Sequence, residues 1–299
     1  MKRLDLQFKD IDVSKYRKRT ALMSDVNTMI NEDVIIYVDD QPVLFYKNLK
    51  EDTSHLRWAV KNVDYVMGKR VRGLESQSAI FGYSPRIAMR HDYCTITSMA
   101  EKKPKQHHII SNFIENIIGY YEEYFPDIFN KHKDIVKEKV LDEWKIAGSP
   151  FTSGIVNKNN QLKYHFDTGN FKGVLSNMIV FKKGTSGGHL VIPALDIALE
   201  VSDNSLTIFN GQDILHGVSP IDYDNEKGYR YSVVYYSLEQ MWKCEPLGDE
   251  VERIRNVKTQ REIKRLDPEH MAKLDKRRLE LEKHSDKEQT ILIEKNKKV

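Results

Sequence analysis

A histidine and a carboxylate stand two positions apart in the segment YHFDTGN, residues 164–170. Because side chains alternate between the two faces of a strand, His165 and Asp167 would point to the same side. An imidazole and a carboxylate presented together are two of the three donors of a facial iron(II) site, whose opposite face stays open. His216, in the segment DILHGV, is the candidate third donor. We therefore predict His165, Asp167 and His216 as metal ligands and as catalytic residues.

An arginine and a serine follow on the strand-like run RYSVVYYS, where Arg230 and Ser232 share one face. A guanidinium fork and a hydroxyl can hold a carboxylate inside a mostly apolar cavity. 2-Oxoglutarate, which can chelate iron through its 1-carboxylate and 2-keto oxygens, has a distal carboxylate that needs such a cation. An HxD pair alone is a weak signal, but HxD, then His, then Arg-x-Ser in strand-like context predicts an Fe(II)- and 2-oxoglutarate-dependent oxygenase.

The elements around these residues change character along the chain. Residues 151–237 hold six β-rich runs separated by Gly, Asn, Asp or Pro, which favours an antiparallel sandwich or jelly roll. Upstream, apolar residues recur at helical spacing from Ile109 to Tyr121, and Pro126 precedes a second expected helix that reaches Lys139. The predicted fold is α+β: a double-stranded β-helix (jelly-roll) core with flanking N-terminal helices and a charged C-terminal helix.

Three segments are expected. Residues 1–75 form a mixed N-terminal segment with a hairpin made by DVIIYVDD and QPVLFY. Residues 76–245 form the dioxygenase domain, with helical support over 105–145 and a β-core over 150–240. Residues 246–299 form a charged helical tail, and from Glu250 to the end basic residues exceed acidic ones by four.

Composition limits the remaining possibilities. The 299 residues contain 47 Lys and Arg against 44 Asp and Glu, a net charge of +3, which gives little support for strong nonspecific polyanion binding. No apolar run is long enough to span a membrane, and the start lacks the apolar core of a secretory signal, so an intracellular protein, cytoplasmic or nuclear, is expected.

Cys94 and Cys244 are interpreted as ordinary thiols. Lys69, Arg70 and Arg72 could contact phosphate or form a solvated loop.

The segment 150–240 resembles the TET/JBP group of iron- and 2-oxoglutarate-dependent nucleobase dioxygenases. The matching residues are YHFDTGN, the block from GGHLVIPALDIALEV to LTIFNGQDILHGV, and RYSVVYY. The resemblance implies that His165, Asp167 and His216 bind iron and that Arg230, supported by Ser232, binds 2-oxoglutarate.

The same resemblance implies two contacts to a flipped base. Asn170 is five residues after the first ligand, and Tyr236 is six residues after the arginine. TET enzymes often carry a histidine two residues further on, where this chain has Leu238, so cytosine and thymine both stay open. From the residues alone, Asn170 could be a turn residue and Tyr236 a core aromatic. Asn157, in the strand before the HxD pair, could reach the cavity but is interpreted as a turn residue.

The resemblance implies an enzyme that hydroxylates the methyl group of a pyrimidine base, 5-methylcytosine or thymine, in nucleic acid, with DNA favoured over RNA. Such a base has to leave the duplex to reach a buried iron. Two alternatives remain. The same cofactor chemistry could act on a protein side chain or a small molecule, or the chain could be a non-catalytic β-sandwich binding module.

Overall fold

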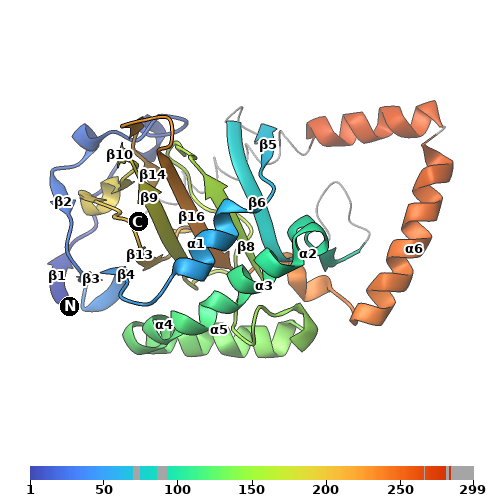
Figure 1. Cartoon of the computed structure of the whole chain (residues 1–299), viewed down its shortest axis with the longest axis horizontal. Helices are drawn as coiled ribbons and strands as arrows, with labels where there is room; N and C mark the ends of the chain where they lie inside the picture. Colours follow the sequence, from blue (N-terminus) through green and yellow to red (C-terminus); the bar gives the residue numbers. More distant parts are fainter. Residues whose placement is uncertain (70–74, 86–92, 266, 281–282, 284–299) are drawn as a thin grey trace.

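The computed structural model describes residues 1–69, 75–85, 93–265, 267–280 and 283. Within them, one large sheet runs through the molecule (Figure 1). Its strand order is β1-β3-β4-β13-β9-β16-β8-β6-β5, and β7 pairs with β6. All of these pairs are antiparallel except β1 with β3. The bounds in sheet order are Lys2–Leu6, Val34–Val38, Gln41–Asn48, Ser205–Phe209, Ser176–Lys183, Tyr229–Tyr236, Ser153–Lys158, Glu75–Ser84 and Val66–Lys69, with β7 at Thr95–Ile96.

The predicted N-terminal hairpin is confirmed, and its two strands extend the large sheet. β3 and β4 pair antiparallel around Asp39 and Asp40, both of which have positive φ. Such values suit the tight turns that match strand twist. β4 then pairs with β13, so strands from the first 75 residues belong to the same sheet as the β-core.

A smaller sheet, in the order β14-β11-β12-β2, packs against the inner face of the large one. Its strands are Gly217–Val218, Leu190–Ile192, Ile197–Leu199 and Thr28–Ile30. A two-stranded ribbon of β10 (Thr185–Gly187) and β15 (Ile221–Tyr223) adjoins it in the chain. Buried apolar side chains of both sheets, including Tyr46, Val180, Ile192 and Leu199, form one cluster. Two sheets around a shared interior give the jelly-roll core.

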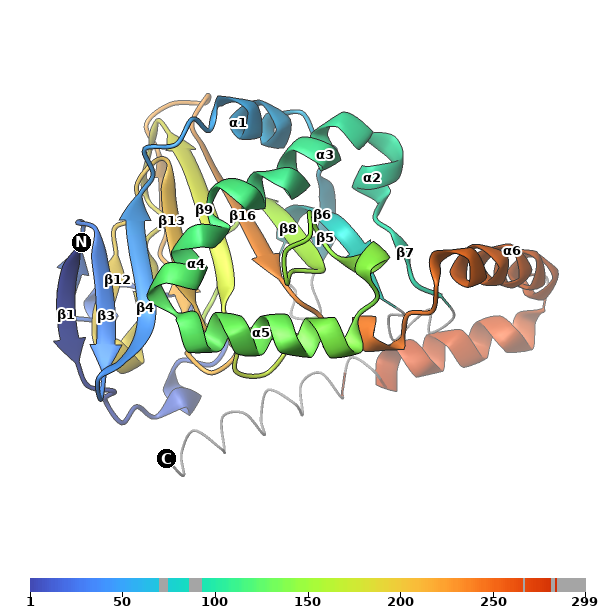
Figure 2. The ribbon, with the colours of Figure 1, turned by 90° about the horizontal axis from the view of Figure 1, so that it is seen from below.

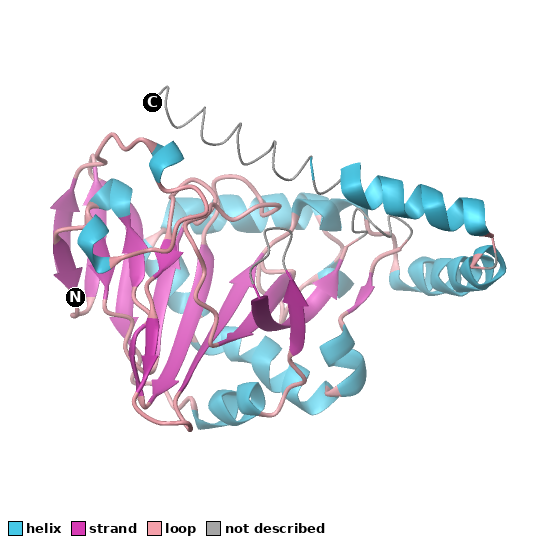
Figure 3. Cartoon of the chain, turned by 90° about the horizontal axis from the view of Figure 1, so that it is seen from above, coloured by secondary structure: helices cyan, strands magenta, loops and turns pink. Residues whose placement is uncertain are grey.

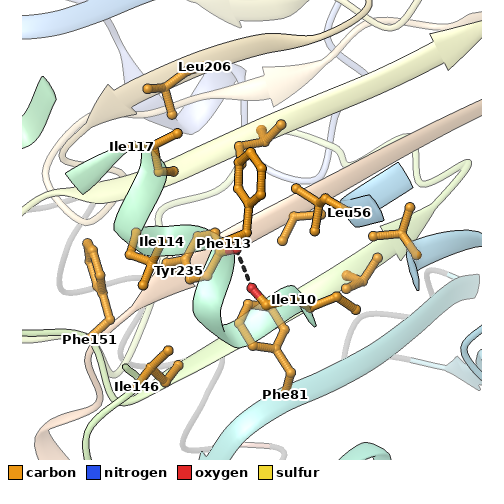
Figure 4. Close-up of a cluster of buried hydrophobic side chains, with 14 of the residues drawn as sticks. Leu56, Phe81, Ile110, Phe113, Ile114, Ile117, Ile146, Phe151, Leu206 and Tyr235 are labelled. Atoms are coloured by element: carbon orange, nitrogen blue, oxygen red, sulfur yellow. Dashed lines mark hydrogen bonds between the residues drawn. The ribbon is translucent and has the colours of Figure 1, made fainter. Parts of the chain in front are cut away.

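Helices cover the other face of the large sheet (Figure 2). They are α1 (Ser54–Lys61), α2 (Ser98–Lys102), α3 (Pro104–Asn112), α4 (Ile118–Tyr124) and α5 (Pro126–Lys139). Figure 4 shows the core they bury, in which the Tyr235 hydroxyl donates to the Ile110 carbonyl at 2.6 Å. Tyr231, Val233 and Tyr235 of β16 face these helices, which leaves Arg230 and Ser232 on the inner face.

The first predicted helix is interrupted. The apolar stretch from Ile109 to Tyr121 divides into α3, a 3₁₀ helix over Phe113–Asn116, and α4. Asn112, Asn116 and Gly119 fall in this stretch, and all three are weak helix formers. Proline stands at the first position of both α3 and α5, where its missing N–H has no helical partner to lose.

The expected charged tail is helical over its described part. α6 (Leu247–Lys264) and helical residues 268–280 lie at the opposite end of the molecule from β1 (Figure 3). Across the described ranges, no helix is both long and apolar enough to cross a membrane.

The interpretation of the two cysteines as ordinary thiols is wrong, because Cys94 and Cys244 form a disulfide. They lie 150 residues apart in sequence, and their Cα atoms are 5.6 Å apart. The pair lies in a buried cluster with Trp144. The fully buried carboxylate of Glu250, in α6, accepts the Cys94 N–H at 2.9 Å. The disulfide therefore anchors the segment that immediately precedes the tail, and the buried hydrogen bond anchors the first turn of α6.

Candidate active site

The three predicted metal ligands meet in space. His165 and Asp167 lie between β8 and β9, and His216 immediately precedes β14. His165 and His216 pair as an isolated antiparallel bridge, with N–H to carbonyl distances of 2.9 and 3.1 Å. The Asp167 Oδ1 lies 3.5 Å from His165 Nε2 and 3.9 Å from His216 Nε2. One donor atom from each residue lies within 4.8 Å of the others, a spacing that a single metal ion can bridge.

Both histidines are held in the tautomer that a metal requires. Nδ1 of His165 lies 2.8 Å from the Lys163 carbonyl, and Nδ1 of His216 lies 2.9 Å from the Ile214 carbonyl. A carbonyl only accepts, so Nδ1 carries the hydrogen in each neutral ring and Nε2 keeps its lone pair for the metal. Burial, with a contribution from nearby His165, lowers the pKa of His216 to about 4, so this ring is neutral at pH 7.

A glycine permits the close approach of the loop around the carboxylate. The Gly211 carbonyl accepts the Asp167 N–H at 2.8 Å. A Cβ built on Gly211 would lie 2.2 Å from Asp167 Oδ2 and 3.1 Å from His216 Cε1. Any side chain at this position would displace the carboxylate. Sequence reasoning missed Gly211, because Asn210-Gly211 reads only as a turn.

The predicted anion-binding pair lies on the inner face of β16. Arg230 is only 3% exposed, and Ser232 is also buried. Nε and Nη2 of Arg230 are buried and have no hydrogen-bond partner. Burial lowers the pKa of Arg230 to about 10, so the guanidinium is still charged at pH 7. A buried cation without a partner is costly to a fold, which is the arrangement expected of a pocket for an anionic ligand.

Neighbouring residues complete this pocket. Gly188 packs so closely on the arginine stem that a Cβ there would lie 2.7 Å from Arg230 Cδ. Asn157 Nδ2 donates to Ser232 Oγ at 3.2 Å. Asn157 is a buried residue within β8, so its interpretation as a turn residue is wrong. Its direct cross-strand partner in β16 is Ser232.

Two further basic side chains adjoin Arg230, and sequence reasoning missed both. Lys182 of β9 is the direct cross-strand partner of Arg230. His189 follows the glycine pair, and its buried Nδ1 has no hydrogen-bond partner. Burial, and then the charge of Lys182, lowers the pKa of His189, so its ring favours the neutral form.

The candidate base-contacting residues lie at the far end of β16. Asn170 pairs with Leu238 as an isolated antiparallel bridge. Its backbone carbonyl accepts from Gln212 Nε2 at 2.5 Å, and its Nδ2 lies 3.5 Å from Ser176 Oγ. Tyr236 is the last residue of β16, half-buried, and it alternates with Tyr235 so that it shares the inner face with Ser232.

A histidine of α3 and the predicted basic cluster lie on other elements of the fold. His107 is an interior residue of α3, where Nε2 accepts the Gly82 N–H at 3.0 Å. Lys69 ends β5, whereas Arg70 and Arg72, its companions in the predicted phosphate-contacting cluster, lie outside the described residues.

Residues 86–239 match the family model Tet_JBP, described as the oxygenase domain of the 2OGFeDO superfamily. The chain belongs to this family. The predicted resemblance is confirmed, and residues 86–239 form an oxygenase domain of the 2OGFeDO superfamily.

Individual relatives are distant. The chain is 21% identical over 122 residues to the bifunctional helicase and thymine dioxygenase JBP2 of Leishmania braziliensis, a match that covers 41% of this chain and 11% of that protein. The chain thus spans only a small part of that relative.

One solved structure confirms the architecture. NgTET1 in complex with 5mC DNA superposes with a TM-score of 0.55 at 12% identity, over 80% of this chain and 89% of that one. An oxidoreductase of the 2OG-Fe(II) oxygenase family from Burkholderia pseudomallei gives a TM-score of 0.39 at 9% identity, over 64% and 82%. The likeness to NgTET1 supports the predicted α+β double-stranded β-helix fold.

Proposed function

We propose that this Tet_JBP oxygenase hydroxylates the methyl group of a pyrimidine base, thymine or 5-methylcytosine, in DNA. The observation that carries the oxygenase chemistry is the convergence of His165, Asp167 and His216 within 4.8 Å, on the same interior as the buried, unpartnered guanidinium of Arg230. The nucleobase substrate is supported by the relatives, since JBP2 is named a thymine dioxygenase and NgTET1 was solved with 5mC DNA.

The donor set fits iron(II) and 2-oxoglutarate. His165 and His216 would each give Nε2, and Asp167 would give a carboxylate oxygen, so that one negative charge and two neutral rings occupy one face. Iron with 2-oxoglutarate supplies oxidation of a C–H bond by dioxygen, coupled to decarboxylation of the co-substrate to succinate.

Arg230 and Ser232 would bind the distal carboxylate of the co-substrate. Nε and Nη2 of Arg230 can each donate one charge-assisted hydrogen bond. The Ser232 oxygen accepts from Asn157, so its own O–H can donate to the same carboxylate. These contacts would fix the long axis of the co-substrate and its distance from the ligand triad.

Asn170 and Tyr236 would hold the base. The amide of Asn170 can both donate and accept, and the hydrogen bond from Gln212 to its carbonyl keeps the backbone in place. The Tyr236 ring offers an apolar face for stacking. The metal ligands are only partly exposed, at 19% for the His165 side chain and 32% for Asp167, so the base would be flipped out of a duplex.

The test is reconstitution with iron and 2-oxoglutarate under anaerobic conditions, followed by admission of oxygen to duplexes containing thymine or 5-methylcytosine. Nucleoside mass spectrometry should detect 5-hydroxymethyluracil or 5-hydroxymethylcytosine, and His216→Ala should form neither. Succinate formation without base oxidation would favour a protein or small-molecule substrate. No iron-dependent succinate with any substrate would favour the non-catalytic binding module.

A further inference from the structure

A short basic loop lies in the N-terminal segment, and the proposed active site does not include it. Residues 15–19 read KYRKR, and the side chains of Lys15, Arg17, Lys18 and Arg19 are all exposed. Residues 1–249 carry one more acidic than basic residue. Four cations in five positions therefore form a local positive feature on a nearly neutral body.

The basic loop is tied to the strand that carries the first proposed ligand. The Arg19 carbonyl accepts the Tyr164 N–H at 3.0 Å, and the Tyr164 hydroxyl donates to Asp25 at 2.8 Å. The Tyr16 ring meets the Tyr164 ring edge-on, with 5.1 Å between centroids. Tyr164 immediately precedes His165, so the basic loop is held one residue away from the metal-binding segment.

Apolar packing also holds the basic loop against residues that are adjacent in sequence to the three proposed ligands. Val13 and Ala21, on either side of the basic loop, are buried in one cluster with Tyr164, Phe166 and Leu215. These three residues are the chain neighbours of His165, Asp167 and His216. The cluster that supports the ligands from behind thus also sets the position of the exposed cations.

We propose that the basic loop is a docking surface for the phosphodiester backbone of duplex DNA, next to the nucleotide that enters the site. This inference rests on the proposed function. Phosphate contacts fix the register of a protein on a duplex, and the bond from the Tyr164 N–H to the Arg19 carbonyl holds these cations close in the fold to the first proposed ligand. Lys15, Arg17 and Lys18 are exposed and would make the phosphate contacts. Arg19 pairs with Asp25 and lies over the Tyr16 ring.

The tail is a weaker candidate for this contact, although it holds the excess of basic residues. Its helices lie at the opposite end of the molecule from the N-terminal strands (Figure 1). At the start of α6, Asp249 and Glu252 stand beside Arg253 and would repel phosphate. The tail therefore provides a matched control surface with exposed cations.

The test compares two triple variants of the full chain in duplex binding across a salt series. Lys15→Ala/Arg17→Ala/Lys18→Ala should weaken binding by on the order of 100-fold at low salt, and should reduce the slope of log affinity against log salt by about 2 to 3. The control Lys273→Ala/Lys276→Ala/Arg277→Ala should bind as the wild type does. Lys15→Arg/Arg17→Lys/Lys18→Arg, which keeps all three charges, should retain binding.

The outcomes separate this inference from the proposed function. If the wild type itself does not bind duplex DNA, the proposed function fails. If the wild type binds and the loop-to-alanine variant binds equally well, or if the tail variant weakens to the same extent, the docking surface is refuted. If the charge-preserving variant also loses binding, the loop acts through its fold and the electrostatic assignment is overturned.

Discussion

Replacing Arg230 with methionine should stabilise the ligand-free protein while abolishing co-substrate binding. The guanidinium is 3% exposed, and its Nε and Nη2 have no hydrogen-bond partner. A buried guanidinium that is paired only when an anionic ligand binds destabilises the ligand-free fold. Methionine has a similar length and no charge, so it can fill the same space without the desolvation penalty.

The size of the effect follows from the burial of Arg230. Burial lowers its pKa to about 10, well below the ordinary value of an arginine. A base whose folded pKa lies below its unfolded one is protonated more readily in the unfolded chain, so at all pH values below about 10 its charge destabilises the fold. At 1.36 kcal/mol per pKa unit, the cost is about 3 kcal/mol. Removing it should raise Tm by about 6 to 12 °C in a protein of this size.

The assay pairs calorimetry of the metal-free protein with anaerobic titration of 2-oxoglutarate into the iron-loaded protein, followed by charge-transfer absorption. Arg230→Met should unfold at a higher temperature and bind 2-oxoglutarate at least about 10-fold more weakly, since hydrogen bonds to charged groups contribute about 1.5 to 3 kcal/mol. Arg230→Lys keeps the charge without the fork and should lose affinity without gaining stability. A methionine variant that is less stable than wild type, or that binds 2-oxoglutarate normally, would refute the reasoning.

Three further predictions concern Gly211 beside the triad, the Cys94–Cys244 disulfide, and His132, a fully buried residue of α5. Gly211→Ala should lose iron affinity, measured by metal content after dialysis, because its Cβ would lie 2.2 Å from Asp167 Oδ2, and Gly211→Ala with normal iron content would contradict that geometry. Cys94→Ser/Cys244→Ser should lower the free energy of unfolding by about 2 to 5 kcal/mol in denaturant titrations, and reductant should do the same to the wild type but not to the variant. Burial lowers the pKa of His132 to about 3, so stability should fall as pH drops from about 6.5 toward 3, where the unfolded chain binds the extra proton. In His132→Gln this pH dependence should be shallower by about 1.4 kcal/mol per pH unit, and equal slopes would show that His132 does not titrate in this way.

The parts of the site that the sequence predicts are those set by strand alternation. His165 and Asp167 share a face because they stand two apart, and Arg230 and Ser232 do so for the same reason. The jelly roll is predicted for a similar reason, since each β-rich run and each turn can be recognised locally.

The parts that escape prediction depend on contacts between distant segments. The Cys94–Cys244 disulfide joins residues 150 positions apart, and nothing local marks them as partners. β2 lies near the N-terminus yet pairs in parallel with β12, which places Thr28–Ile30 in the smaller sheet. In the sequence Gly211 looks like an ordinary turn residue, and only the structure shows that its carbonyl accepts the Asp167 N–H. The basic loop likewise looks like an ordinary charged stretch, and only the structure shows that the Arg19 carbonyl accepts the Tyr164 N–H.

The most direct test of base hydroxylation is the ratio of succinate to oxidised base. The reconstituted enzyme would be given oxygen and matched duplexes that differ only in the methyl group, thymine against uracil and 5-methylcytosine against cytosine. We predict that one methylated duplex of the two yields hydroxymethyl base and succinate in equal amounts, and that its unmethylated partner yields no oxidised base. Succinate formation that is the same with methylated and unmethylated duplexes, without any hydroxymethyl base, would contradict a role for this site in nucleobase oxidation.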